Sequence, residues 1–246
     1  MIPSLEPLRV SNLKDACVLR LEELILSGDL KTGERLPSER DLAMRLNISR
    51  PVLHEALVEL ATRGLVSILP RRGVVVNDYR KTGSTAILSS LLTYNNGQLD
   101  PKFIDSLLAM RLLLEVEGAA LAAKHATKEQ VAELRELTGI KMEFAGGEIQ
   151  SLTALDFDFH LLIAIASGNL IYPLIINSFK NVYTHFTGEF FRLCKDEKVF
   201  REVSQFQHRL VDAISRKDSS EASHVMREML LHGEKHLKGL INDNSK

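Results

Sequence analysis

Apolar residues recur with helical spacing along most of this 246-residue chain, and polar or glycine-containing breaks separate the periodic stretches. Leu13, Cys17, Leu21 and Ile25 predict a first helix that ends near Gly28. Beyond residue 85 the same spacing predicts helices at about 86–95, 101–125, 128–145, 151–167, 170–192, 197–216 and 219–241. The chain is therefore expected to be mainly α-helical.

Two helix-start signals lie eleven residues apart near the amino terminus. Ser38 can cap one helix, with Asp41 at the third helical position. Ser49 can cap the next helix, with Pro51 in its first turn. Between them Asn47 takes the place of the usual Gly of a tight turn, because Asn tolerates positive φ. This layout predicts a helix-turn-helix.

A short basic hairpin is predicted directly after these helices. Residues 66–69 and 74–76 have the composition of two strands, and Pro70 and Gly73 can turn the chain between them. The tip of this turn carries two consecutive arginines. A hairpin in this place is the wing of a winged helix-turn-helix.

Arginines gather on this predicted unit, away from its apolar positions. Guanidinium groups bind phosphate oxygens and guanine edges, and the positive start of the second helix adds to their field. The alternative is a small helical domain with solvated arginines. The combination of turn, caps, hairpin and arginines favours binding to double-stranded DNA through Arg40, Arg45, Arg50, Arg71 and Arg72.

Composition limits the classes open to this chain. With 45% hydrophobic and 26% charged residues it is expected to be an ordinary soluble globular protein, with no membrane-spanning run and no signal-peptide pattern. Residues 1–80 hold 12 Lys and Arg against 11 Asp and Glu, and the remainder holds 19 against 21. The prediction of DNA binding therefore rests on clustered arginines rather than on net charge. Cys17 and Cys194 match no metal-binding spacing and suit a reduced cytosol.

A chain of this length suits two domains. The stretch Asn77–Thr85 is polar and contains Gly83, so we place the linker there. The expected domains are a winged helix-turn-helix at 1–78 and an all-α antiparallel helical bundle at 79–246.

The predicted helix 151–167 is apolar nearly all round and should be central in the bundle. Asp156 and His160 nevertheless lie four residues apart on one of its faces. A buried ionisable pair is costly unless it is satisfied. The pair can be half of a divalent-metal site or an Asp–His hydrogen bond that orders the core, and the spacing does not choose between them.

With these motifs the chain resembles GntR-type bacterial transcription regulators of the FadR branch. The resemblance implies a winged helix joined to an FCD-type, all-helical ligand-binding domain, and a homodimer on a near-palindromic operator that is released or retained by a small effector. It covers nearly the whole chain and is strongest at Leu36–Ala43, Ile48–Arg50, Glu55–Leu57, Gly64–Val66, Asp156–His160 and Ser167–Asn169.

The resemblance implies specific DNA contacts. The positions that contact DNA in the family match Arg40, Ser49 and Arg50, and the wing contact matches Arg72 and Gly73. An Arg is usual where this chain has His54, whose shorter ring can still donate to a phosphate or a base edge. With the arginines above, the expected DNA-contacting residues are Arg40, Arg45, Ser49, Arg50, Pro51, His54, Arg71, Arg72 and Gly73.

The effector domain departs from the family pattern. Many relatives bind a divalent metal through the Asp and His of the central helix and two further histidines, whose positions here hold Gln207 and Met229. Helical spacing places both residues toward the core and His208 toward solvent. An amide and a thioether are poor ligands for zinc or nickel. Asp156 and His160 therefore form an incomplete metal site, and a bound divalent metal is less expected than its absence.

The chain also resembles, locally, the fatty acyl-CoA-responsive member of this branch, which lacks the metal site. The match lies at Ser167–Asn177, Val182–Thr184, Phe190–Phe191 and Phe103–Arg111. A core lined by Phe157, Phe186, Phe190, Leu210 and Met229 could take an acyl chain, or these side chains could simply fill the bundle.

The spacing of four residues between Arg111 and Glu115 allows an ordinary ion pair on one helix. Alternatively, the two residues lie at the mouth of the pocket, where the family resemblance implies that Arg111 binds a carboxylate ligand. His224, His232 and His236 fall on mixed polar faces and are expected to be solvated. The candidate effector-binding residues are Arg111, Asp156, His160, Tyr172, Asn177, Tyr183, Gln207 and Met229.

We therefore expect a cytoplasmic, nucleoid-associated bacterial transcription regulator, a repressor in type, whose effector is a small carboxylate or similar metabolite. The linker near Lys81–Thr85 would carry the effector signal to the DNA-binding heads. The alternatives are a fatty acyl-CoA-responsive regulator without metal, a helical metalloenzyme that uses Asp156 and His160, and a helical interaction module with a vestigial DNA head. The enzyme is disfavoured because no third strong ligand and no nucleophile accompany the pair.

Overall fold

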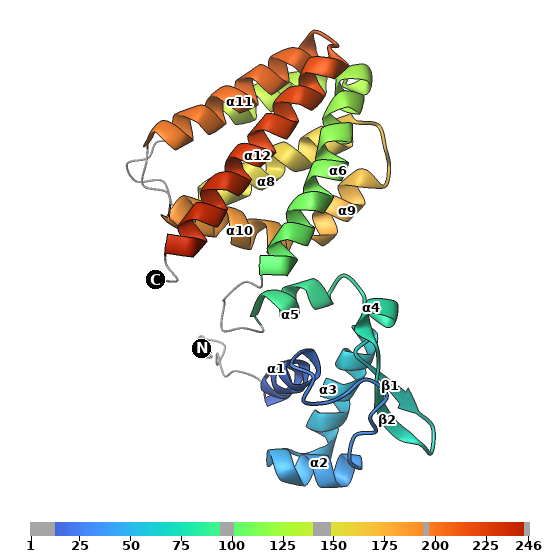
Figure 1. The fold of residues 1–246 in the computed structure, drawn as a ribbon. Coiled ribbons are helices and arrows are strands. Elements are labelled where there is room, and N and C mark those ends of the chain that lie inside the picture. Colours follow the sequence, from blue (N-terminus) through green and yellow to red (C-terminus); the bar gives the residue numbers. More distant parts are fainter. Residues whose placement is uncertain (1–12, 94–100, 140–148, 194–196, 244–246) are drawn as a thin grey trace, which may run out of the picture. The chain divides into compact units, whose positions relative to one another are not determined.

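The computed structural model describes residues 13–93, 101–139, 149–193 and 197–243. The chain divides into two compact units, Met1–Gln98 and Leu99–Lys246, here called the head and the helical unit (Figure 1). This division lies later in the chain than the expected boundary at residue 78. Tyr79 and Ile87 pack into the hydrophobic core of the head, so the segment that follows the wing belongs to that unit.

Three helices form the base of the head: α1 (Leu13–Leu26), α2 (Glu39–Leu46) and α3 (Arg50–Thr62). The first helix ends close to the predicted position, since Gly28 has φ +82° and the Leu30 N–H donates to the Leu24 carbonyl at 2.8 Å. α1 and α2 both pack against α3, whose Leu53, Ala56 and Leu60 are completely buried.

The predicted caps of the helix-turn-helix are confirmed. The Ser38 hydroxyl accepts from the Asp41 N–H at 3.2 Å, and the Ser49 hydroxyl accepts from the Val52 N–H at 3.4 Å. Asn47 adopts the left-handed conformation, with φ 51° and ψ 44°, and ends α2. These polar residues satisfy backbone groups at the ends of α2 and α3, and so they fix where each helix ends or begins and how the chain turns between them.

The predicted wing is a two-stranded antiparallel sheet of β1 (Val66–Leu69) and β2 (Gly73–Val76). Val66 pairs with Val76 and Leu69 pairs with Gly73, and an isolated bridge joins Arg35 to Val75. The tip turns through two positive φ angles, +60° at Arg71 and +82° at Gly73. These angles point the chain back along the sheet and leave the arginine pair exposed.

The expected linker at 77–85 is instead attached to the head. It contains a short helix, α4 (Tyr79–Thr82), which Asp78 caps by accepting from the Arg80 N–H at 3.3 Å. The Thr82 hydroxyl donates to the Gly64 carbonyl at 2.8 Å. A Cβ at Gly64, where φ is +82°, would lie 2.0 Å from the Thr82 carbonyl oxygen, so only glycine permits this close approach.

A second attachment follows at α5 (Ile87–Thr93). The Arg63 guanidinium donates to Glu22 at 2.5 Å and to the Ser90 hydroxyl at 3.2 Å, and it also pairs with Glu59. Glu59 in turn pairs with Lys14 at 2.6 Å. This partly buried network joins α1, α3 and α5, and the sequence analysis did not predict it.

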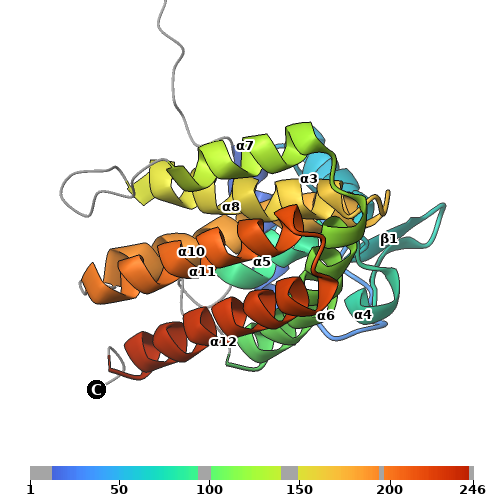
Figure 2. The ribbon, with the colours of Figure 1, turned by 90° about the horizontal axis from the view of Figure 1, so that it is seen from above.

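The helical unit contains α6 (Pro101–His125), α7 (Lys128–Gly139), α8 (Ile149–Ala166), α9 (Tyr172–Ser178), α10 (Lys180–Leu193), α11 (Glu197–Ser215) and α12 (Ser219–Asp243). α12 packs between α6 and α11 (Figure 1), and α7 packs against both α8 and α11 (Figure 2). The fold is thus the expected one: a winged helix-turn-helix with a small wing, followed by an all-helical bundle.

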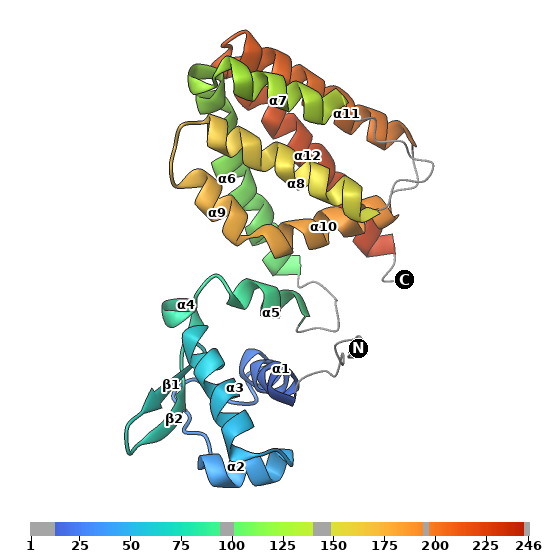
Figure 3. The same cartoon turned by 180° about the vertical axis from the view of Figure 1, so that it is seen from behind.

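One predicted helix, 170–192, is wrong as a single element. It is two helices, α9 and α10, which separate at Phe179 (Figure 3). Phe179 has φ −95° and ψ 5°, and its N–H is shared between the carbonyls of Ile175 and Ile176. The apolar periodicity continues through this break, so the pattern alone could not locate it.

The central position predicted for the apolar helix is confirmed. α8 packs against α6, α7, α9 and α10, and it is the one helix in the described parts of the chain that is long and apolar enough to cross a membrane. Most of its apolar side chains are buried inside the helical unit, among them Phe157, Phe159 and Ile163. Core burial therefore accounts for its hydropathy.

Candidate nucleic-acid interface and ligand cavity

The residues predicted to contact DNA all lie on the surface of the head. We call this set the DNA-contact surface, and its members are exposed without exception: Arg40, Arg45, Ser49, Arg50, Pro51, His54, Arg71, Arg72 and Gly73. Arg50 is the first residue of α3, where the backbone N–H groups and the helix dipole favour an anion. Side chain and helix end therefore contribute positive potential at the same place.

The five arginines of the DNA-contact surface form no ion pair with any residue that the structure describes. Three other arginines of the head do have acidic partners: Arg20 pairs with Glu23, Arg63 with Glu22 and Glu59, and Arg80 with Asp78. An unpaired exposed guanidinium keeps all five donors available for phosphate or guanine. Among the described residues, acidic side chains thus pair with arginines outside the DNA-contact surface and with none of the arginines inside it.

His54 has a protein partner that the sequence analysis did not anticipate. Its Nδ1 lies 3.2 Å from the Glu39 Oε1, so the ring links α3 to the start of α2. Both side chains remain accessible, with 54% of His54 and 29% of Glu39 exposed. One ring nitrogen is therefore engaged within the protein, and a phosphate contact would have to use the other.

The helical unit encloses a cavity of about 80 Å³. Its wall is mainly apolar and aromatic, and its lining side chains come from α6, α8, α10, α11 and α12. Five of the eight residues predicted to bind an effector line it: Arg111, Asp156, His160, Tyr183 and Met229.

The three other predicted effector residues are not among the lining residues. Tyr172 and Asn177 belong to α9, and Asn177 is exposed to solvent, because the break at Phe179 separates α9 from the helix that lines the cavity. Gln207 is buried on α11, as its spacing predicted, but one turn beyond Val203, which does line the cavity. His208 is exposed as expected.

The aromatic residues divide between two environments. Phe186 and Phe190 line the cavity together with Phe191, which stacks on Phe200 at 5.4 Å between ring centroids. Phe157 instead lies in a separate core cluster with Tyr183. Some of these aromatic side chains thus form a cavity wall and others fill the bundle, and the acyl chain stays a prediction.

A connected set of polar side chains lies along one wall of the cavity, and every member except Glu115 lines it. We call it the polar cluster, and its members are Arg111, Glu115, Asp156, His160 and Tyr183. Arg111 donates to Glu115 at 2.6 Å and to the Tyr183 hydroxyl at 2.9 Å. The Tyr183 hydroxyl donates to Asp156 at 3.0 Å, and the His160 Nδ1 forms an ion pair with Glu115. Arg111 also lies over the Tyr183 ring, 4.2 Å from its centroid.

Burial and charge act against each other in this cluster. Desolvation disfavours the ionised Glu115, but the charges of Arg111 and His160 outweigh it and lower the pKa of Glu115 to about 2. Desolvation also opposes the charge on Arg111, yet Glu115 and Tyr183 raise the pKa of that guanidinium. Burial raises the pKa of Tyr183 well above its usual value. The cluster therefore holds a carboxylate, a guanidinium and a neutral phenol.

Asp156 and His160 were expected to form either half of a metal site or an Asp–His hydrogen bond. His160 Nε2 lies 4.0 Å from Asp156 Oδ1, which is too long for a hydrogen bond, and its Nδ1 faces Glu115 instead. Of the two positions where the family resemblance expects further histidines, Met229 brings only a thioether to the cavity, and Gln207 is not among the lining residues. Among the described residues this donor set does not fit the divalent metal that the family pattern implies.

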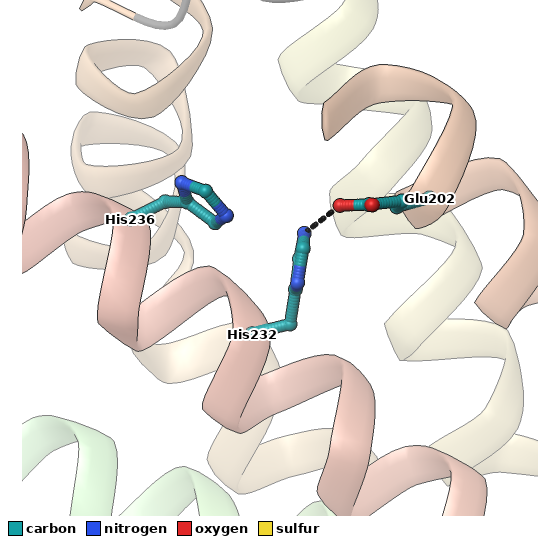
Figure 4. A group of neighbouring side chains, drawn as sticks. All are labelled: Glu202, His232 and His236. Atoms are coloured by element: carbon teal, nitrogen blue, oxygen red, sulfur yellow. Dashed lines mark ion pairs between the residues drawn. The ribbon is translucent and has the colours of Figure 1, made fainter. Parts of the chain in front are cut away.

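The expectation that the carboxy-terminal histidines are solvated is correct for His224 and wrong for His232. His224 has 60% of its side chain exposed, whereas only 16% of His232 is exposed. The rings of His232 and His236 lie 4.6 Å apart and face Glu202 (Figure 4). The spacing of four residues was visible in the sequence, but the partner from α11 was not.

Comparison with known proteins assigns each unit. Residues 13–76 match the model of bacterial regulatory proteins, gntR family, and residues 106–232 match the FCD domain. The chain is 26% identical over 246 residues to the uncharacterized HTH-type transcriptional regulator YcbG of Bacillus subtilis, with 98% of this chain and 99% of that protein aligned. These matches follow the division into head and helical unit.

Two further similarities extend this comparison. The chain is 31% identical over 162 residues to the fatty acid metabolism regulator protein of Yersinia enterocolitica, with 66% of this chain and 65% of that protein aligned. The solved structure of Lar, described as controlling the expression of the Listeria monocytogenes agr system, has a TM-score of 0.62 at 15% identity. It covers 94% of this chain and 99% of that one, and shows the same fold. The named relatives are regulators, not enzymes.

Proposed function

Because the chain belongs to the gntR family of bacterial regulatory proteins and carries an FCD domain, we propose that it binds a near-palindromic operator as a homodimer and that a small effector in the helical unit controls its affinity. The observation that carries the DNA part is the DNA-contact surface, where five exposed arginines have no acidic partner among the described residues. Such arginines gain their charge partners when phosphates arrive.

The operator geometry follows from the helix-turn-helix. One head offers one α3 to one major groove, so two heads are needed to contact two half-sites one helical turn apart. The wing arginines Arg71 and Arg72 would contact the backbone or the minor groove beside each half-site. Binding would take place in the cytoplasm, on the nucleoid, and repression is the expected outcome.

For the effector we propose a small carboxylate-bearing metabolite. Arg111 supplies a permanently charged guanidinium at the cavity wall, and the Tyr183 hydroxyl lies beside it. Asp156 can accept a hydrogen bond from a hydroxyl or amine on the same ligand. Because Glu115 already pairs with Arg111, the effector would share this guanidinium rather than meet an unpaired charge. A cavity of about 80 Å³ suits a small molecule.

A fatty acyl-CoA is the second candidate. Two observations favour it, the relative named as a fatty acid metabolism regulator and the wall of phenylalanines from α10. The cavity volume opposes it, because sites for larger ligands usually measure about 300–1,000 Å³. An acyl chain would therefore need the helices to move apart.

Effector binding must act through the connection between the two units. The segment Lys81–Thr85, where we expected the hinge, begins within α4, and Ser84 inside it donates its N–H to the Arg63 carbonyl at 3.0 Å. We therefore place the coupling later, at the division between Gln98 and Leu99. An effector can shift the heads only by binding one arrangement of the units better than the other.

The test uses a duplex selected from a random DNA library by the purified full-length chain. We expect salt-dependent binding to that duplex and its release or retention when the effector is added, with small carboxylates and acyl-CoAs compared in parallel. A chain that retains no duplex at low ionic strength would overturn the DNA-binding proposal.

Gly233 offers a control for the effector part. It lines the cavity, and a Cβ added there meets no heavy atom within 4 Å. Gly233→Leu should fill the cavity and abolish the effector response while DNA affinity without effector stays the same. Gly233→Ala is the matched small substitution and should retain the response. If Gly233→Leu responds like the wild type, the effector binds elsewhere.

A further inference from the structure

Two imidazoles and a carboxylate converge at a place that the proposed function does not use. His232 and His236 lie one turn apart on the same face of α12, and Glu202 reaches toward them from α11 (Figure 4). We propose that Glu202, His232 and His236 form a divalent-metal site suited to zinc. The donor set of two histidines and one glutamate is one that Zn²⁺ accepts with a fourth position left open.

The spacing of the donor atoms is close to what a metal requires. One donor atom from each residue lies within 4.8 Å of the other two, and the His232 Nε2 lies 3.5 Å from the Glu202 Oε2. Bonds of about 2.0–2.2 Å in a tetrahedron separate two ligands by about 3.3–3.5 Å. One ligand pair already has this separation, and side-chain rotation on two adjacent helices can bring in the third.

The state of His232 also fits a metal ligand. Its Nε2 is buried and has no hydrogen-bond partner among the described residues, a condition that costs free energy unless something satisfies the atom. A metal would satisfy the lone pair that the protein leaves unmatched.

A plain ion pair is the competing explanation, and the surroundings argue against it. The Lys198 ammonium already lies 3.8 Å from the other oxygen of the Glu202 carboxylate, so this carboxylate has a cationic partner without His232. A salt bridge would not require the second ring, yet His236 is held 4.6 Å from His232 between ring centroids. Two adjacent rings directed at one carboxylate are better explained by a shared ligand.

The site has a consequence for the cavity. Val203 follows Glu202 on α11, Gly233 follows His232 on α12, and both Val203 and Gly233 line the cavity. A metal would tie these two helices together along one wall of the cavity and would restrain that wall. The site is separate from the polar cluster, which uses none of its three residues.

The experiment titrates zinc into the metal-stripped full-length chain, with a chromophoric chelator as competitor and no DNA present. We expect one zinc per chain and an increase of the melting temperature. His236→Gln and Glu202→Gln should each weaken zinc binding by roughly tenfold or more and abolish the thermal shift. Cobalt(II) should give the visible absorption of a tetrahedral site in the wild type and in neither of these two variants.

His224→Gln is the matched control. This histidine is also on α12 and also lies beside a glutamate four residues on, at 3.5 Å from Glu228, but it is exposed. Its loss should leave zinc binding unchanged. Asp156→Asn tests the cavity as an alternative location. Zinc binding that survives His236→Gln, or that is lost in Asp156→Asn but not in Glu202→Gln, would overturn the proposal.

Discussion

The head and the helical unit place charged side chains in opposite environments. The DNA-contact surface keeps five arginines exposed and without acidic partners among the described residues. The polar cluster buries Arg111 between Glu115 and Tyr183, with only 18% of its side chain and 4% of the Glu115 side chain exposed. The first arrangement leaves charge available to a polyanion, and the second fixes charge before any ligand arrives.

This difference determines what a substitution should change. An exposed arginine is well hydrated, so its removal affects DNA affinity and leaves folding almost intact. A buried ion pair is retained only while each member has its partner, so its disruption affects stability first.

Glu115→Gln should give the largest effect, a loss of about 3–5 kcal/mol in the free energy of unfolding. The substitution keeps the size of the side chain but removes the charge that both Arg111 and His160 face. The measurement is urea unfolding of the full-length chain, followed by circular dichroism.

The control for this prediction is Glu189→Gln. Glu189 pairs with Arg192 through an equally direct contact, 2.6 Å, but 57% of the Arg192 side chain is exposed. Its loss should cost less than about 1 kcal/mol. Equal costs for the two substitutions would mean that burial does not distinguish these pairs.

Acid should weaken the helical unit through the same carboxylate. The pKa of Glu115 falls from 4.5 to about 2 in the folded chain, so the folded state binds this proton less readily than the unfolded state. Its stabilising contribution is therefore present above about pH 4.5 and is lost as the pH falls toward 2. The difference in urea midpoint between wild type and Glu115→Gln should shrink over this interval. A constant difference would contradict the assignment.

Local signals explain why the head was the easier unit to predict. Ser38, Asn47 and Ser49 act on backbone groups within four residues, so sequence neighbours suffice to place α2 and α3. Two features of the head were not predicted, α4 and the Arg63 network. Both depend on contacts between residues that are far apart in the sequence. Glu22 and Arg63 are 41 residues apart.

The helical unit depends on such distant contacts throughout. Spacing identified Asp156 and His160 as a pair, but the partner of His160 is Glu115 on another helix, and the partner of Asp156 is Tyr183 on a third. The same limitation concealed the place of Glu202 beside His232. A helical period specifies which side of a helix faces inward, but not which helix it meets.

Arg50→Ala should weaken binding to the selected duplex by about 1–3 kcal/mol, which is roughly five- to 150-fold. The unfolding free energy should stay within about 0.5 kcal/mol of the wild type, because Arg50 is exposed and has no ion-pair partner among the described residues. Arg20→Ala is the control, since Arg20 is also exposed but pairs with Glu23 on α1. Gel shifts in which both variants bind like the wild type would remove Arg50 from the DNA-contact surface.

His54→Gln should give the smallest effect. It tests a residue of the DNA-contact surface that, unlike the five arginines, has an acidic partner. Solvent reaches both members of the pair with Glu39, so its loss should cost no more than about 1 kcal/mol of stability. DNA affinity should fall by a similar amount, because an unpaired Glu39 carboxylate would then stand near the phosphates.

A double-mutant cycle separates this indirect effect from a direct contact. If His54 acts by neutralising Glu39, the double variant Glu39→Gln, His54→Gln should bind the duplex as well as the wild type does, because no carboxylate remains to repel the phosphates. If the ring donates to DNA itself, the double variant should stay as weak as His54→Gln. The second result would place His54 with Arg50 as a contact residue, and the first would make it the one member of the DNA-contact surface that acts through a protein partner.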